Sequence, residues 1–430
     1  MNRKVGAVLI AIAGILPAMS CAAQLTLDYC QEKAHENYPM LKKYGIVEKM
    51  EALDLSDVNK GWLPQATLYG QGTIQNAVPA FPEALRGVLA QMGQDYKGLG
   101  KFQYKIGLDV NQTIWDGGVS KSRRASARAD ALEQSAALDV QLYGLNEQVQ
   151  GLFFGILLIE EQIKQTEETL GVINANLTRL RAMLQNGTAM QSDVDMLEAQ
   201  GLTIGQQLTA ARGSALQYRE ALGILMGEDV TADTFDCPAA ELPADMTSAR
   251  PELKLFEARR DANDVRKAAV KASLMPRIGV FASIYEGYPG LDYFASMRDR
   301  SMSFNAMAGV KVSWNISSLY DRKNSLTRIR LADESVEVDR QMFMRNTELS
   351  VSKSRREIET MRKTMADDSR IVALRTNVRN AAESQLRNGV IDATDLLAKI
   401  SDENQARLNS AYHQIRLTQM IYALKDILNR

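Results

Sequence analysis

The most constraining feature of this sequence is an apolar ladder that runs from residue 138 to residue 184. Apolar side chains recur there in steps of three and four, and Thr166 replaces one of them. The ladder consists of Leu138, Leu142, Leu145, Val149, Leu152, Ile156, Ile159, Ile163, Leu170, Ile173, Leu177, Leu180 and Leu184. A seven-residue repeat kept this long favours left-handed supercoiling with partner helices. A helix from about 120 to 185 would be about 100 Å long at ~1.5 Å per residue, too long to pack inside a compact globule.

The same stepping resumes after a short interruption, which indicates a second long helix. Its apolar positions are Leu197, Gly201, Ile204, Leu208, Ala211, Ala215, Tyr218, Leu222 and Leu225. The second half of the chain is less regular, although Ile371, Leu374, Val378 and Ala381 keep the spacing. We therefore predict long helices over 118–186, 192–226, 318–387 and 394–428.

A second periodicity, of two residues, marks extended segments at about 65–74, 102–111, 277–286 and 303–315. In the segment after Phe102, apolar side chains alternate with polar ones such as Lys105 and Asp109. Alternation over about ten residues is typical of tilted membrane strands with one face in lipid and one in water. A half-buried sheet in a soluble domain is the alternative.

Three observations favour the membrane interpretation. The segments are long for strands of soluble proteins, the N-terminus resembles an export signal, and Trp115 and Trp314 stand where interfacial aromatic residues belong. Four strands are too few to close a membrane barrel, which needs about eight. Because open edges are not tolerated in hydrocarbon, several chains must share one barrel, so this interpretation requires an oligomer.

The N-terminal residues MNRKVGAVLIAIAGILPAMSCAA combine early basic residues, a short apolar run and then small residues. This order is typical of a bacterial export signal, and the run is too short to span a bilayer. We expect residues 1–23 to be removed. Lipidation of Cys21 is the alternative, although Ala18 is a weak residue where a lipobox usually has Leu.

Few side chains here are suited to covalent or metal chemistry. Beyond Cys21, Cys30 and Cys237 are expected to be free or packed thiols. The two histidines, His35 and His413, are not spaced as metal ligands. Lys and Arg number 51 against 52 Asp and Glu, so the net charge indicates no nucleic acid partner. We predict no catalytic residue, metal or cofactor.

The chain also repeats itself. Pro64 and Pro276 each precede an extended segment, and Gly187 and Gly389 each interrupt a helical pattern, in the same order in both halves. Such self-similarity predicts a duplicated unit. The expected repeats are 24–226 and 250–430, joined by a connector over 227–249.

With these parts in this order, the sequence resembles the TolC family of outer membrane efflux proteins over essentially the whole mature chain. The resemblance is carried by LTLDYCQEKAHENYP at 25–39, Trp62-Leu63-Pro64, Trp115-Asp116-Gly117-Gly118, Arg250-Pro251-Glu252-Leu253, Met275-Pro276, and Asn-Gly followed by Asp at both helix reversals. No single motif is specific, whereas their order and spacing are.

The resemblance implies a mainly α fold with a membrane β-barrel. A homotrimer would form a shared 12-stranded β-barrel in the outer membrane of a Gram-negative bacterium, with four strands per chain, and a long coiled-coil α-barrel in the periplasm. The connector would lie in an equatorial belt. Such proteins are not enzymes; they are passive, gated exit ducts in tripartite efflux or type I secretion, joined to an inner-membrane transporter through a periplasmic adaptor.

Asp193 and Asp395, each six residues after a tip glycine, are expected by this resemblance to line the periplasmic aperture. Three copies of each acid around one axis would focus negative potential and select cations. The alternative is helix capping, with Ser192 or Thr394 as the N-cap and the acids in the first turn. Some family members carry a second acid where this chain has Ala398; Asp392 is the candidate replacement.

The reversals Asn186-Gly187 and Asn388-Gly389 combine a structural and an implied functional role. Gly supplies the left-handed conformation that ends a helix, and adaptor hairpins dock at these tips in the family. The polar strand faces are expected to line a watery lumen; they carry Gln71, Lys105, Asp109 and Lys311.

A hypothesis from another class is a periplasmic coiled-coil scaffold or binding protein with a small sheet and no pore. An enzyme ranks below both, because the sequence offers no nucleophile–base set. The exported substrate and the class of pump are not encoded in recognisable motifs.

Overall fold

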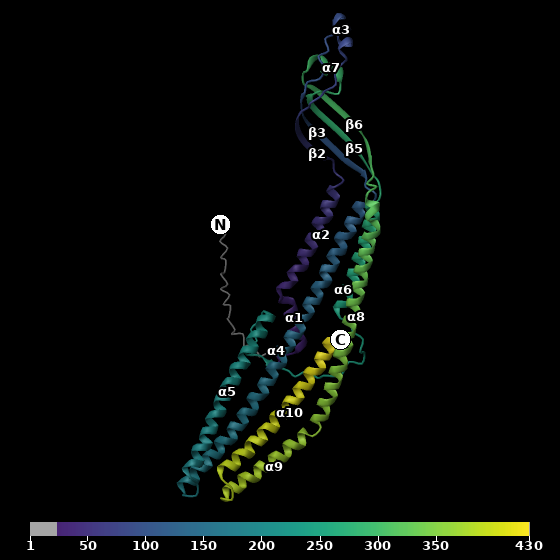
Figure 1. The fold of residues 1–430 in the computed structure, drawn as a ribbon. Helices are drawn as coiled ribbons and strands as arrows, with labels where there is room; N and C mark the ends of the chain where they lie inside the picture. Colours follow the sequence, from purple (N-terminus) through teal and green to yellow (C-terminus); the bar gives the residue numbers. More distant parts are fainter. Residues whose placement is uncertain (1–23, 430) are drawn as a thin grey trace, which may run out of the picture. The chain divides into compact units, whose positions relative to one another are not determined.

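The computed structural model describes residues 24–429, so the predicted export signal and Cys21 lie outside the described residues. The chain divides into two compact units, each assembled from separate stretches of sequence. The helical unit comprises residues 24–41, 142–249 and 347–429, and the sheet unit comprises residues 42–141 and 250–346. Figure 1 labels their elements in chain order.

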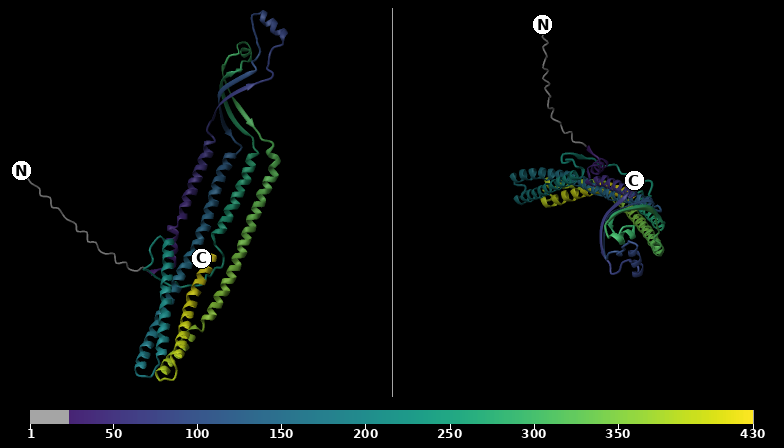
Figure 2. Two further views of the ribbon diagram at one scale, coloured as in Figure 1. Left: turned by 60° about the vertical axis from the view of Figure 1, so that its left-hand side comes forward. Right: turned by 90° about the horizontal axis from the view of Figure 1, so that it is seen from above.

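The helical unit is built on two helical hairpins that lie side by side (Figures 1 and 2). The first hairpin joins the second part of α4 (Val119–Gln185) to α5 (Gln191–Met226), and the second joins α9 (Asp368–Arg387) to α10 (Ala393–Leu428). Its core holds the aromatic pair Phe153 and Phe154, both fully buried. The predicted heptad ladder therefore faces the interior, since Leu145, Val149 and Ile156 belong to the same core.

Short elements complete this unit. Helix α1 (Leu27–Asn37) begins at Thr26, whose hydroxyl accepts the Tyr29 N–H, and is followed by the 3-10 turn η1 (Pro39–Leu41). Strand β1 (Gln24–Leu25) pairs in parallel with β4 (Thr234–Phe235) from the predicted connector.

The prediction of one helix over 318–387 is wrong. The structure has α8 (Ser318–Met365) and then α9, with a break at Ala366 and Asp367. The Ala366 N–H bonds to the carbonyl of Lys363, one residue closer than in a regular α-helix. Two consecutive aspartates favour a helix start over a helix interior, and His413 of α10 meets the second, Asp368, at 2.8 Å.

The sheet unit holds one antiparallel sheet of four strands. They are β2 (Gln65–Ile74), β3 (Phe102–Trp115), β5 (Arg277–Tyr288) and β6 (Ser303–Ser313), in the spatial order β2-β3-β5-β6. The four predicted extended segments are therefore confirmed as strands. Their register leaves β2 and β6 each with one side unpaired, so the sheet has two open edges.

Helices lead into and out of these strands (Figure 1). They are α2 (Lys42–Lys60), the first part of α4, α6 (Pro251–Ser273) and the first part of α8. Side chains tie neighbouring helices: Glu133 pairs with Arg259 at 3.3 Å, and Lys267 and Asn263 both reach Asp333. Burial acts to raise the pKa of Asp333, but these two hydrogen bonds outweigh it and the pKa is lowered.

The connections between the strands contain short helices, α3 (Glu83–Gln91) and α7 (Tyr293–Asp299). Among residues 24–429, no helix is both long enough and apolar enough to span a membrane. The same residues contain no cluster of His, Cys, Asp and Glu suited to a metal ion.

Candidate functional site

The two helix reversals have the same backbone construction. Gly187 and Gly389 have φ values of +73° and +69°. At the first tip, the Thr188 N–H bonds to the carbonyl of Met183, and at the second, the Val390 N–H bonds to that of Gln385. The left-handed glycine lets the chain close these bonds and satisfy carbonyls that a helix end leaves unpaired.

The helices that follow the tips, α5 and α10, do not begin at the N-caps that the sequence suggested as an alternative. Neither Ser192 nor Thr394 is an N-cap; both lie inside their helices. At the start of α5, the Asp193 carboxylate accepts the Met190 N–H at 3.1 Å. At the start of α10, Asp392 is the N-cap and accepts the Asp395 N–H at 2.9 Å. A carboxylate is a stronger acceptor than a hydroxyl and interacts favourably with the helix N-terminus, which favours the acids in this position.

A cavity of about 560 Å³ lies between the two tips of one chain. The structure brings the three predicted acids to it: Asp193, Asp392 and Asp395 all line the cavity, as do Gly187 and Gly389. Asn186 and Asn388 are exposed and lie outside its lining. Ala398 is also exposed, but it is not part of this lining. The acidic character of the tip therefore comes from three carboxylates. Those of Asp193 and Asp392 each accept a main-chain N–H at a helix start, and Asp395 donates its own N–H to Asp392.

An apolar seam fixes the tips to each other. Buried side chains from all four helices form one cluster: Ile173, Leu177, Leu180, Val194, Leu197, Ile204, Ala382, Leu386, Ala393, Leu396 and Ile400. Leu197 and Leu396 are fully buried. Each such side chain contributes about 1.5–3 kcal/mol relative to an exposed one, so the tip geometry is held mainly by side-chain packing.

A buried polar network adjoins this seam. Glu403 of α10 is 6% exposed and accepts hydrogen bonds from Arg379 at 2.6 Å, Thr376 at 2.8 Å and Arg407 at 2.8 Å. Burial acts to raise the pKa of Glu403, but these hydrogen bonds outweigh it and the pKa is lowered. A buried carboxylate with three donors is satisfied, whereas removal of one partner would leave a charge uncompensated.

The same network links the two hairpins. Arg379 also donates to Glu383 at 2.9 Å, and Glu383 lies 3.6 Å from Arg179 of α4. The Asn176 amide of α4 reaches Glu383 at 3.4 Å. Polar side chains therefore connect α4 directly to α9 within the helical unit. Sequence reasoning missed this network, because its contacts between helices, such as Arg179 with Glu383 and Arg379 with Glu403, join residues that are not local in the chain.

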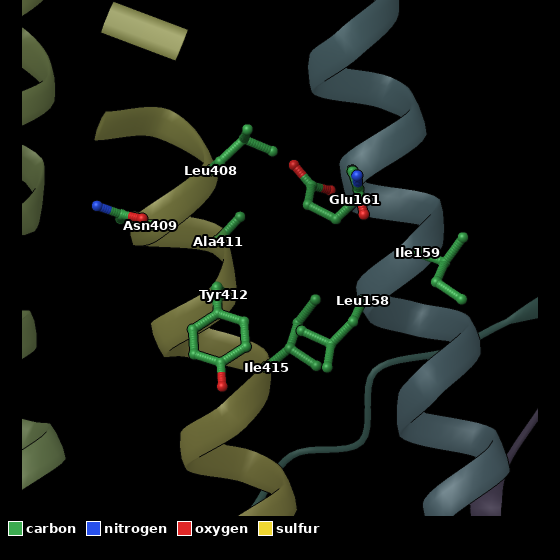
Figure 3. A pocket seen from close by; sticks show the side chains of 9 residues that line it. Leu158, Ile159, Glu161, Leu408, Asn409, Ala411, Tyr412 and Ile415 are labelled. Atoms are coloured by element: carbon green, nitrogen blue, oxygen red, sulfur yellow. The ribbon is translucent and has the colours of Figure 1, made fainter. Parts of the chain in front are cut away.

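A groove of about 340 Å³ runs between α4 and α10 (Figure 3). Its walls are mainly apolar, and Leu158 and Ile415 point toward each other between the two helices, whereas Asn409 points away. Tyr412 and Glu161 add polar groups to its rim. The packing of α4 against α10 therefore leaves an apolar depression between the two helices.

In the sheet unit, the two faces of the sheet differ as the alternation predicts. One face carries Leu68, Ile106, Phe304, Val310 and Val312, all exposed. Phe304 is 73% exposed and Val310 is 69% exposed, which is unusual for large apolar side chains clustered on one surface. An apolar face of this kind is suited to lipid rather than to water.

Aromatic side chains mark both ends of this apolar face. Trp115 and Trp314 stand at the ends next to the helices, and the Trp314 indole donates to the carbonyl of Leu274 at 3.0 Å. Phe102 and Phe304 stand at the other end. From Phe304 to Trp314, at ~3.3 Å per residue and a tilt of about 40°, the strand rises about 25 Å, the height of the apolar band in membrane barrels.

The opposite face is polar and carries the predicted lumen residues. In the register, Gln71 lies opposite Lys105, and Asp109 accepts the Ser283 hydroxyl at 2.6 Å. Lys311 lies on the same face of β6, opposite Gly279. The structure therefore brings Gln71, Lys105, Asp109 and Lys311 onto one surface.

The connections beyond the strands form a loop cap, made of residues 75–101 and 289–302. Phe81 of one connection stacks on Phe294 of the other, with ring centroids 5.8 Å apart. Arg300 donates to the carbonyls of Gly98 and Lys97 at 3.0 and 2.7 Å, and Leu99 and Met297 are buried. No sequence pattern predicted this loop cap, since the contacts join two connections about 200 residues apart in the chain.

Unpartnered apolar side chains also follow the outer helices of the sheet unit. On α2, Ile46, Met50 and Leu53 are exposed, and on α8, Leu331, Val338 and Met342 are exposed. The α2 set is spaced by four and three residues and the α8 set by seven and four, so each set lies on one face of its helix. They belong to the helices that adjoin the two open-edge strands, β2 and β6.

Comparison with known proteins identifies the architecture. Residues 58–228 match the family model described as outer membrane efflux protein. The outer membrane protein VceC from Vibrio cholerae shares 14% identity at a TM-score of 0.66, over 94% of this chain and 95% of that chain. The outer-membrane channel OprN shares 15% identity at a TM-score of 0.68, over 94% and 89%. No curated protein sequence matches the chain significantly.

A third solved structure, the open state of the MtrE outer membrane channel from Neisseria gonorrhoeae, shares 16% identity at a TM-score of 0.66, over 94% of this chain and 88% of that chain. These likenesses confirm the mainly α fold with its four-stranded sheet. The family match confirms the resemblance predicted from the sequence. The matched family consists of efflux channels of the outer membrane, which are transport proteins and not enzymes.

Proposed function

We propose, from the premise that this chain has the fold and family match of an outer membrane efflux protein, that it is the exit duct of a tripartite efflux or type I secretion system. The observation that carries the proposal is the sheet with one exposed apolar face, one polar face and two open edges. A single chain with such a sheet is incomplete in lipid, because every backbone donor and acceptor needs a partner there.

The proposed assembly is a homotrimer with a 12-stranded barrel. Strand β6 of one chain would pair with β2 of the next, and the apolar stripes on α2 and α8 would be covered in the same contact. Two different edges that meet in this way form a head-to-tail interface, which closes into a ring. Four strands per chain and three chains give a barrel size that membranes accommodate.

The helix tips are proposed as the periplasmic end, where an adaptor docks. Met190 and Val390 expose large apolar side chains at the tips, beside the reversals Asn186-Gly187 and Asn388-Gly389. Exposed apolar groups rimmed by polar residues are suited to a protein partner. The adaptor would in turn connect the duct to an inner-membrane transporter.

The acids Asp193, Asp392 and Asp395 are proposed to form the aperture of the closed duct. Three chains would bring three copies of each acid around one axis, so the local potential would be strongly negative. Opening would require the hairpins to move apart, and the polar network through Glu383 and Arg179 would resist that movement. Substrates would pass without any chemical change.

The channel proposal is tested by purification and electrical recording. The protein is expected to require detergent, to migrate as a trimer and to conduct ions in planar lipid bilayers. The periplasmic scaffold hypothesis predicts instead a water-soluble protein without conductance, and that result would reject the duct.

Adaptor docking is tested by co-purification from native membranes. The double substitution Met190→Ser and Val390→Ser should reduce the amount of adaptor retained, since it removes the exposed apolar contacts. Ile371→Ser is the matched control, because Ile371 is exposed on α9 but is not part of the tip. Equal retention in all three proteins would reject docking at the tips.

A further inference from the structure

A lysine on the polar face of the sheet is flanked by two tyrosine rings. The Lys105 Nζ atom lies 5.5 Å from the ring centroid of Tyr69 and 5.6 Å from that of Tyr285. The three residues come from three adjacent strands, β3, β2 and β5. A cation within about 6 Å of a ring centroid is attracted by the electron-rich face. Within residues 24–429, this ammonium group lies against aromatic rings and not against a carboxylate.

Two glycines make room for this arrangement. Gly107 lies opposite both Tyr69 and Tyr285 in the register. A Cβ atom at Gly107 would stand 2.6 Å from the Cβ of Tyr285 and 3.0 Å from the Tyr69 hydroxyl. Gly287 lies opposite Lys105, where a Cβ atom would stand 2.5 Å from the Lys105 Cβ. The two tyrosines therefore converge over a position without a side chain, and the lysine extends into the same region.

The surrounding polar face has an excess of positive charge. Lys311 and Arg277 lie on this face with Lys105, whereas Asp109 is its acid. The Asp109 carboxylate already accepts the Ser283 hydroxyl at 2.6 Å. Lys105 and both tyrosine side chains are half-buried, so the ammonium group and the ring edges can still be reached from the polar side. A solute on this face would meet one cation and two aromatic surfaces together.

We propose that Lys105, Tyr69 and Tyr285 form a subsite for aromatic monoanions on the polar face of the sheet. The ammonium group would bind the carboxylate or sulfonate of the solute, and the tyrosines would pack against its ring. Aromatic cations would be disfavoured by the lysine charge, and aliphatic anions would lack the ring contact. This subsite rests on the proposed duct, since it requires the polar face to line a water-filled lumen.

The experiment uses the intact trimer in planar bilayers and three probes added at rising concentration. Naphthalene-1-sulfonate is the aromatic anion, methanesulfonate the aliphatic anion and benzyltrimethylammonium the aromatic cation. Naphthalene-1-sulfonate should reduce the conductance at concentrations where the other two do not. Lys105→Gln should weaken this block about tenfold, the effect of losing about 1.4 kcal/mol of binding, whereas Lys105→Arg should retain it because arginine keeps both the charge and the ring contact.

Two further variants separate the subsite from a general effect of charge. Lys311→Gln removes a cation from the same face and should leave the block unchanged. Tyr285→Leu should abolish the preference for naphthalene-1-sulfonate over methanesulfonate, and it carries the test if Lys105→Gln does not assemble.

The outcomes distinguish the two proposals. A protein without conductance would reject the duct itself. A conducting trimer that blocks equally in the wild type and Lys105→Gln, or that responds to Lys311→Gln instead, would leave the duct intact and reject the subsite. Equal block by all three probes would show that neither the charge nor the ring of the solute matters. That result would also reject the subsite and leave Lys105 with a structural role between the tyrosines.

Discussion

The helix tips and the sheet are stabilised by different interactions. At the tips, side chains carry the structure: an apolar seam joins four helices, and a buried network through Glu403 connects them. In the sheet, main-chain hydrogen bonds in a regular register carry the structure, and the side chains on its two faces are mostly exposed or half-buried. The tip surface is acidic, with three carboxylates around one cavity, whereas the polar face of the sheet is mainly basic.

This difference indicates which amino-acid substitutions each region tolerates. A scaffold of main-chain bonds tolerates replacement of outward side chains, so the chemistry of the sheet faces can vary without loss of fold. A scaffold of packed side chains is sensitive to single replacements, so the tips should tolerate fewer substitutions than the faces of the sheet. The following predictions test this contrast in order of decreasing effect.

The largest effect is expected from Leu396→Ala at the tip. Leu396 is fully buried in the apolar seam, and its truncation should destabilise the hairpin pair by about 2–5 kcal/mol. Hydrogen exchange of the tip amides would measure the loss. Val390→Ala is the control, because Val390 is exposed beside the same tip; an equal change in both variants would contradict a packed seam.

Glu403→Gln should be the next most damaging change. It weakens the hydrogen bonds from Thr376, Arg379 and Arg407 and leaves Arg379 with less compensation, at an expected cost of about 1.5–3 kcal/mol at pH 7. Because the Glu403 pKa is lowered from its ordinary 4.5, the wild-type stabilisation is complete above that pH and is lost as the pH falls through the lowered value.

Thermal unfolding followed by circular dichroism between pH 7 and pH 3 measures this dependence. The difference in stability between wild type and Glu403→Gln should shrink toward the acid end. A difference that stays constant over this range would show that ionisation of Glu403 does not contribute.

A smaller effect, about 1–3 kcal/mol, is expected from Gly107→Ala in the sheet. The new methyl group would meet the Cβ of Tyr285 at 2.6 Å and the carbonyl of Ile284 at 2.7 Å, so the strands must shift. Heat dissociation of the purified oligomer would measure it. Gly70→Ala is the matched control in the neighbouring strand, where a Cβ atom has no neighbour within 4 Å; similar losses at both glycines would reject the crowding argument.

The smallest effect is expected from Asp395→Ala, which should raise the resting conductance or weaken block by multivalent cations. An exposed, salt-screened charge contributes about 0.5–1 kcal/mol, which corresponds to a change of about two- to fivefold in the blocking concentration. Asp195→Ala is the control, since Asp195 is an exposed acid near the start of α5 and lies outside the tip cavity. Unchanged conductance and block would leave Asp395 without a role at the aperture.

Local periodicity in the sequence predicted much of the fold, because heptads and alternation depend on residues close in the chain. The strands around Lys105 and Val310 and the ladder through Val149 were identified in this way. The predicted N-caps Ser192 and Thr394 were wrong, because the helices begin two residues earlier, after Met190 and Asp392. Several polar residues near each reversal are acceptable N-caps, and the local pattern does not rank them. The break near Asp367 was missed for a similar reason.

Features that depend on register could not be predicted at all. The convergence of Tyr69 and Tyr285 on Lys105 requires the exact pairing of three strands, and the approach of Arg179 to Glu383 requires the packing of two hairpins. The sequence did bring Asp193, Asp392 and Asp395 to attention, and the structure places them around one cavity; their role in gating stays a prediction.

The two open edges of the sheet also have a consequence for the folding and assembly of the protein. If the chain is exported as predicted, it would cross water with an apolar face and two unpaired edge strands, and such edges pair readily with any extended segment they meet. In the proposed trimer, closure of the ring would remove this hazard only when three chains meet, so folding and assembly would become one concentration-dependent event. At low expression, the unassembled monomer rather than the proposed trimer would be the main species exposed to proteases and chaperones.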